Sequence, residues 1–138
     1  MQPTSQHFQA AVVEDALRLL EAFVDATPGV TFAVLSSADG FEIAAHPRGV
    51  ARARRLAAMS SSLQALSEAM AGEAGLEGIR NLVIESNGGT VIVLGLGKVT
   101  PRLSLTVVAR GDETLGRLLW ASRECCASLE RRLLPATN

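Results

Sequence analysis

The chain has 138 residues, of which 48% are hydrophobic and 20% are charged. This length suits one domain with a single core, and the composition is that of an ordinary globular protein, which excludes disordered and fibrous chains. The 13 lysines and arginines stand against 14 acidic residues, so the net charge is −1 and no surface for nucleic acid is indicated. We expect residues 1–138 to form one domain, ordered over about residues 5–134.

The sequence has no segment that stays apolar over the roughly 20 residues that a membrane-spanning helix requires. Its first residues, MQPTSQHFQ, lack the basic segment and the apolar core of a secretory signal. We therefore expect a cytoplasmic protein that does not insert into membranes.

The first third of the chain predicts a helix followed by a hairpin. Apolar residues recur every three or four positions over residues 5–27, which indicates an amphipathic helix, and the sequence TPG then ends it. The stretches VTFAVLSS (30–37) and FEIAAH (41–46) have the β-branched and aromatic residues of strands. Between them, Asp39 and Gly40 tolerate the positive φ of a tight turn, so an antiparallel hairpin is predicted.

Three polar residues of this hairpin, Asp39, Glu42 and His46, could be read as a catalytic cluster. Asp39 falls in the turn, Glu42 lies on one face of its strand, and His46 leads into the break HPRG. The three side chains are therefore not expected to converge. We interpret the segment as a hairpin without a reactive site.

A second helix is predicted over residues 50–72, and two of its sides are uncharged. One side carries large apolar residues, which we expect to cover a face of the sheet: Leu56, Met59, Leu63, Leu66 and Met70. The nearly opposite side carries small residues: Ala58, Ser62, Ala65, Ala69 and Gly72. A side facing water would ordinarily carry lysine and glutamate, so we predict self-association through the small residues. A plain exposed surface of alanine and serine is the alternative.

Three further strands are predicted at residues 79–86, 90–96 and 103–110, and a last helix follows Asp112, a suitable N-cap. The link NGG favours a tight hairpin between the first two of these strands, and a longer loop with Pro101 joins the last two. The order is then α-β-β-α-β-β-β-α. Because the strands come in hairpin-linked groups, the predicted fold is an α+β sandwich with a mainly antiparallel five-stranded sheet and helices on its faces.

The motif GLGK (95–98) suggests a phosphate-binding loop, but it lacks two required residues. Ile92 stands where that loop needs a glycine, and Val99 stands where it needs a serine or threonine. The sequence also has no nucleophile elbow and no dinucleotide fingerprint. We interpret GLGK as the tip of a hairpin and predict no catalytic residue and no cofactor.

The only two cysteines, Cys125 and Cys126, are neighbours in the last predicted helix. Their side chains point about 100° apart, so we expect no bond between them, with one cysteine in the core and the other partly exposed. The only histidines, His7 and His46, lie far away and form no ligand spacing with them. No metal site is predicted.

Four stretches of the chain together resemble the roadblock, or dynein light chain, family: PGVTFAVLSSADGFEIAAH, ARRLAAMSSSLQALSEAM, IRNLVIESNGGTVIVLGLG and LSLTVVARGDETLGRLLWASRECCASLERRL. They cover most of the chain, up to about Leu134, in one order of elements. The resemblance implies a five-stranded antiparallel sheet between helices. It also implies dimers in which the middle helices pack together and the strand at residues 79–86 pairs with its counterpart.

The resemblance implies a regulator or adaptor, because the family's proteins are not enzymes in their own right and bind small Ras-like GTPases or serve in larger assemblies. Bacterial members include the partner of a gliding-motility GTPase. The implied partners are a second copy and a small Ras-like GTPase, whose hydrolysis of GTP is stimulated or whose localisation is controlled. The implied dimer interface comprises residues of the middle helix and the third strand: Ala58, Ser62, Ala65, Ala69, Ile79, Leu82 and Ile84.

Three arginines at the start of the middle helix, Arg52, Arg54 and Arg55, could contact the acidic surface of a partner. We interpret them instead as a solvated helix end, and no arginine is nominated as a finger for a nucleotide site. A sensory module of similar architecture that holds a small ligand between the sheet and a helix is the alternative function.

Overall fold

The computed structural model describes residues 8–137, and within them the elements follow the predicted order. They are α1 (Ala10–Ala26), β1 (Val30–Ser36), β2 (Glu42–His46), α2 (Ala51–Glu73), β3 (Asn81–Ser86), β4 (Gly89–Leu96), β5 (Leu103–Arg110) and α3 (Leu115–Thr137). The predicted start of the first helix, residues 5–7, lies outside the described residues. The last helix begins three residues after Asp112, the predicted N-cap.

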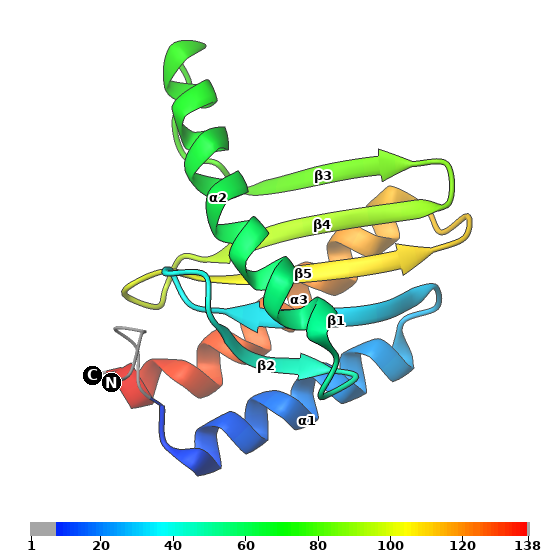
Figure 1. Ribbon diagram of the computed structural model, residues 1–138, viewed down its shortest axis with the longest axis vertical. Coiled ribbons are helices and arrows are strands. Elements are labelled where there is room, and N and C mark those ends of the chain that lie inside the picture. Colours follow the sequence, from blue (N-terminus) through cyan, green and yellow to red (C-terminus); the bar gives the residue numbers. More distant parts are fainter. Residues whose placement is uncertain (1–7, 138) are drawn as a thin grey trace.

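The five strands form one sheet in the order β2-β1-β5-β4-β3, and every neighbouring pair is antiparallel. The predicted hairpins are confirmed in the pairs β1–β2, β3–β4 and β4–β5. The pairing of β1 with β5 joins the first hairpin to the later meander. It leaves β2 and β3 as the two edges, and α2 connects these edges by crossing the sheet (Figure 1).

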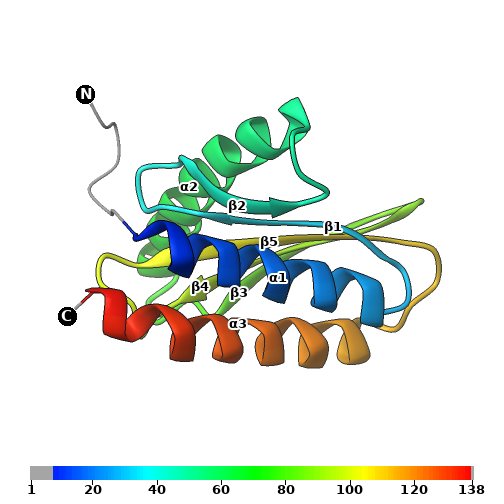
Figure 2. The same cartoon turned by 90° about the horizontal axis from the view of Figure 1, so that it is seen from below.

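Helices cover both faces of the sheet, as predicted. Helices α1 and α3 lie side by side on one face, and α2 lies on the other (Figure 2). The main core fills the layer under α1 and α3, where Leu20, Leu105 and Leu129 are fully buried. Alternation along β5 places Leu103, Leu105, Val107 and Ala109 in this core.

Helix α2 touches the sheet through small and polar side chains. Its buried residues are Ala53, Ala57, Ser60 and Ala71, and only a small apolar cluster, around Phe32 and Val34, lies beneath its first turns. Farther along, Ser60 hydrogen-bonds Thr106 and Gln64 accepts a hydrogen bond from Ser104, both partners being buried on β5. The helix therefore lies close to the sheet, and the polar residues of β5 find partners there.

The prediction that the large apolar side of α2 covers the sheet is wrong. Met59, Leu66 and Met70 of that side are exposed, and Leu56 and Leu63 are half-buried. Three stripes of this helix share the same spacing of three and four residues, so periodicity alone does not choose among them. The sheet-facing stripe is chosen by β5, whose serine and threonine require polar partners.

The turn of the first hairpin rests against α2. Gly40 has a φ of 89°, and a Cβ there would lie 3.1 Å from Cβ of Ser61 and 3.3 Å from Cα of Ala58. Ser61 also donates a hydrogen bond to the carbonyl oxygen of Ala38. Glycine at position 40 thus meets two requirements, the positive φ of the turn and the close approach of a helix.

We predict that Ala57→Leu lowers the free energy of unfolding by about 1–3 kcal/mol, because the larger side chain pushes α2 away from the sheet. The matched control, Ala11→Leu, enlarges an exposed alanine of α1. It is expected to change the free energy of unfolding by less than about 0.5 kcal/mol. Urea unfolding followed by circular dichroism measures both. Equal effects would contradict the small-residue contact between α2 and the sheet.

Candidate functional site

The structure does not assemble the polar residues of the first hairpin into a reactive cluster. Asp39 and Glu42 are exposed, whereas His46 is half-buried. The Nε2 atom of His46 lies 3.9 Å from a carboxylate oxygen of Asp25, which belongs to α1 and not to the hairpin. Among the described residues, no group of three or more histidine, cysteine or acidic side chains is arranged to hold a metal ion.

The two cysteines of α3 are free and both are buried, so the prediction that one is partly exposed is wrong. Helix α3 packs against both α1 and β4, and two neighbouring side chains about 100° apart are therefore both covered. Burial raises the pKa of Cys125 from 9.0 to about 12. Burial, followed by the charges of Cys125 and Glu130, raises the pKa of Cys126 as well. Protonated thiols are poor nucleophiles and poor metal ligands.

The most distinctive exposed feature is the apolar side of α2, which we call the α2 seam. It consists of Leu56, Met59, Leu63, Leu66 and Met70. Met59 is 53% exposed, Leu66 59% and Met70 66%. Monomeric proteins seldom expose neighbouring large apolar side chains in this way, so such a patch marks an interaction surface.

The α2 seam points toward the uncovered part of the sheet. The opposite flank of α2 contacts two turns, through the hydrogen bond of Ser61 to Ala38 and the ion pair of Glu68 with Arg102. Residues two positions apart on a helix lie about 200° apart, so the seam faces the other way. On that side, β3 and β4 extend without a helix in front of them (Figure 1).

The strand register places apolar residues of β3 and β4 beside the α2 seam. Thr106 faces α2, Val93 is its partner on β4, and Leu82 is the partner of Val93 on β3. Two residues along, the register pairs Val91 with Ile84, which therefore lie on the same face. Ile84 is 45% exposed, and it belongs to a strand at the edge of the sheet. The seam with Leu82, Ile84 and Val91 is hereafter the α2–β3 surface.

The residues predicted for the dimer interface occupy two places. Leu82 and Ile84 lie on the α2–β3 surface, and Ile79 precedes β3. The small residues of α2 lie on the side that points away from the sheet, and all four are exposed: Ala58, Ser62, Ala65 and Ala69. The large residues of the seam were missed as interface residues because they were assigned to the sheet. The sequence did contain a sign of this arrangement: Ser104 and Thr106 on β5 need hydrogen-bond partners, which a large apolar side of α2 could not provide.

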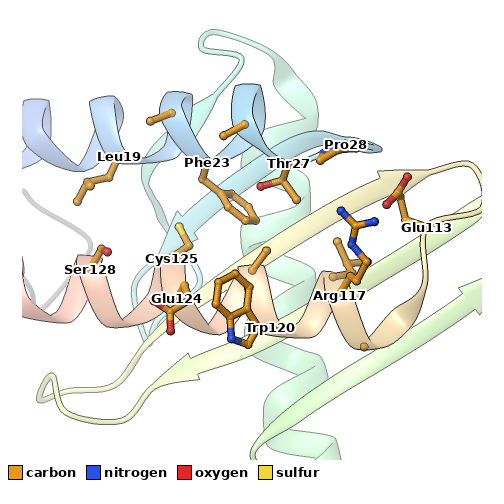
Figure 3. A pocket seen from close by; sticks show the side chains of 15 residues that line it. Leu19, Phe23, Thr27, Pro28, Glu113, Arg117, Trp120, Glu124, Cys125 and Ser128 are labelled. Atoms are coloured by element: carbon orange, nitrogen blue, oxygen red, sulfur yellow. The ribbon is translucent and has the colours of Figure 1, made fainter.

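A hollow that the sequence analysis did not predict lies between α1 and α3, on the face of the sheet opposite α2 (Figure 3). It has a volume of about 660 Å³. Phe23 points from α1 into the space between the two helices, and Trp120 of α3 stands at its rim, 68% exposed. Glu113, Arg117 and Glu124 add charges of both signs to the lining. The hollow can accept an apolar side chain, and its mixed charges select no particular ion.

The fold and these surfaces define an α+β scaffold whose prominent features are places of contact. A model of the Roadblock/LC7 domain family matches residues 16–109, which extend from the middle of α1 to the end of β5. The chain belongs to this family. None of the curated proteins compared with the chain matches its sequence.

Solved structures share the whole fold. A Roadblock/LC7 domain from Streptomyces avermitilis has a TM-score of 0.75 at 24% identity, over 86% of this chain and 97% of its own. The gliding protein MglB from Thermus thermophilus has a TM-score of 0.82 at 20% identity, over 98% and 100%. MglB from Myxococcus xanthus has a TM-score of 0.75 at 14% identity, over 96% and 97%. The predicted fold is thus confirmed.

Helices of the described segment do not reach the length and apolarity that crossing a bilayer requires.

We predict that the folded protein loses stability as the pH rises above about 9. The unfolded chain gives up its thiol protons near pH 9.0, whereas folded Cys125, whose pKa is about 12, keeps its proton. Between these values the unfolded state binds fewer protons, so the free energy of unfolding falls with pH, by about 1.4 kcal/mol per pH unit for one thiol. Urea unfolding over this pH range measures the slope. Cys125→Ala should make this slope smaller. An unchanged slope would contradict the role of the Cys125 thiol in the loss of stability.

Proposed function

We propose that the chain is a non-enzymatic regulator or adaptor that forms a homodimer through its α2–β3 surface and binds a small Ras-like GTPase. The observation that carries the dimer is the exposure of Met59, Leu66, Met70 and Ile84 on one continuous side of the molecule. Apolar side chains of this size gain about 1 kcal/mol or more each when a partner removes them from water. The proposed setting is the bacterial cytoplasm.

The dimensions of α2 support the arrangement of the two copies. Its 23 residues make a helix about 35 Å long, while five strands span only about 19 Å. The end of α2 projects beyond β3 (Figure 1). If the edge strand β3 pairs antiparallel with β3 of a second copy, each projecting helix lies over the sheet of the other copy. The free backbone groups of both edges are then satisfied.

The proposed interface keeps the residues predicted from the sequence and adds the α2 seam. Leu82 and Ile84 lie where the two β3 strands would meet, and Ile79 precedes them. The seam would face the α2 seam of the second copy across the uncovered sheet. Ala58, Ser62, Ala65 and Ala69 would let another backbone approach the outer side of α2 closely.

Binding of a GTPase is supported by membership in the Roadblock/LC7 family, whose proteins act on such partners or as adaptors. Two proteins of similar structure are MglB from Thermus thermophilus, a gliding protein, and MglB from Myxococcus xanthus. A ligand between α2 and the sheet is less well supported, because Ala53 and Ala57 are fully buried there and leave no space. The proposal therefore assigns the function to surfaces.

We predict that Met70→Glu converts the dimer into a monomer, because a carboxylate would be buried in the proposed contact. Trp120→Glu is a matched control, since Trp120 is 68% exposed and Met70 66%, but Trp120 lies on the opposite face. Light scattering coupled to size exclusion measures the mass. A monomeric wild-type protein, or a dimer that survives both Met70→Glu and Ala65→Glu, would contradict the proposed interface.

We further predict that the immobilised protein retains a Ras-like GTPase of its source organism in one nucleotide state more than in the other. The GTPase is loaded with GDP or with a non-hydrolysable GTP analogue, and bound protein is quantified. Met70→Glu, as a monomer, should retain less, because the partner contacts the assembled dimer. Equal absence of binding in both states would refute the GTPase as partner, and GTP hydrolysis assays then separate stimulation from simple binding.

A further inference from the structure

Three arginines line a depression at the beginning of α2. Arg52 and Arg55 come from the first turns of the helix, and Arg110 comes from the end of β5. Phe32 and Val50 contribute apolar walls, and no acidic residue belongs to the lining. The depression has a volume of about 410 Å³. We call it the arginine pocket.

The positive charges of the arginine pocket are not neutralised within the described part of the chain. Neither Arg52, Arg55 nor Arg110 forms an ion pair or a side-chain hydrogen bond there. Four other arginines form ion pairs with acidic side chains: Arg18, Arg48, Arg102 and Arg132. Arg54, Arg80 and Arg117 form none within the described residues, but they do not line the pocket. A chain with a net charge of −1 therefore concentrates three uncompensated charges in one hollow.

The start of α2 reinforces this positive potential. No side chain caps its first turn, and that turn contains no acidic residue. The free N–H groups and the helix dipole therefore add to the field of the arginines. The arginine charges and the helix N-terminus both favour an anionic group at the pocket. The arginines come from α2 and β5, and they determine where that group would bind.

The arginines spread the positive charge over two elements of the fold, which suits an acidic segment with several carboxylates. Arg52 and Arg55 are three residues apart, so their Cα atoms are separated by about 4.5 Å along the helix axis. Arg110 extends the charge to the strand side of the pocket. Each guanidinium can hold one carboxylate with two parallel hydrogen bonds. Val50, which is exposed, and Phe32 offer apolar contacts between these charges.

We propose that the arginine pocket is a docking site for an acidic segment of a partner protein, with aspartate or glutamate side chains spaced along an extended stretch. The pocket lies at the first turns of α2, whereas Leu66 and Met70 of the α2–β3 surface lie toward the end of this helix. Binding of an acidic segment at the arginine pocket requires neither the dimer nor the GTPase.

The test uses a fluorescently labelled synthetic peptide of alternating glutamate and alanine, with a matched peptide of glutamine and alanine. Anisotropy should show binding of the glutamate peptide alone, weakening as sodium chloride is added. Arg55→Glu and Arg110→Glu should each weaken it by about tenfold or more. Arg54→Glu is the matched control, because Arg54 belongs to the same helical turn but does not line the pocket, and it should change binding less than about twofold.

A titration of the wild-type protein followed by NMR avoids dependence on the folding of the variants. Amide shifts should concentrate at residues 31–32, 50–55 and 110. Equal binding of the glutamine peptide, an equal loss in Arg54→Glu, or shifts elsewhere would overturn the proposal. Displacement of the peptide by inorganic phosphate, but not by sodium chloride of equal ionic strength, would show a phosphate site in its place. The masses of the variants, measured by light scattering, should equal that of the wild type. A loss of peptide binding at unchanged mass then reports on the arginine pocket and not on dimer formation.

Discussion

The structure depends on one geometric constraint, which is that α2 must connect the two opposite edges of the sheet. The strand order β2-β1-β5-β4-β3 places the end of β2 at one edge and the start of β3 at the other. A helix of 23 residues makes this connection with length to spare, because it is longer than the sheet is wide. The end of α2 therefore extends past β3, and its apolar residues there have no surface of this chain to cover.

The composition of α2 follows from the polar character of the strand beneath it. Ser104 and Thr106 are buried at the centre of the sheet and require hydrogen-bonding partners, which Gln64 and Ser60 provide. A helix side that satisfies them cannot also be the large apolar side. The α2 seam is thereby rotated toward open β3 and β4, and it joins Ile84 in one surface. Burial of polar groups under α2 thus determines where apolar groups are exposed.

The sequence predicted the elements and the hairpin pairs well because each of these signals was local, whereas the pairing of β1 with β5 was not predicted. The Asp39-Gly40 turn, the TPG stop and the alternation along β5 each involve residues that are near neighbours in the chain. It failed where the outcome depended on distant elements. Three stripes of α2 have the same periodicity, so the sequence could not tell which one faces the sheet. Cys125 and Cys126 are both buried because α1 and β4 each cover a part of α3. The hollow beside Trp120 is formed only where α1 and α3 pack together. Periodicity shows which residues share one side of a helix, but it does not show which element packs against that side.

The arginines and the apolar seam of α2 differ in the distance over which they act. Uncompensated arginines at its beginning exert a field that extends over about a Debye length, roughly 8–10 Å in physiological salt, so they act on a partner before contact. The α2 seam, which runs along the helix from Leu56 to Met70, contributes only when water is excluded, because the hydrophobic effect is proportional to the area removed from water. Buried, protonated thiols and the scattered residues of the first hairpin add no reactive group to either end. One helix thus carries charged groups whose field reaches into the solvent and apolar groups that stabilise a contact only once water has been removed from it.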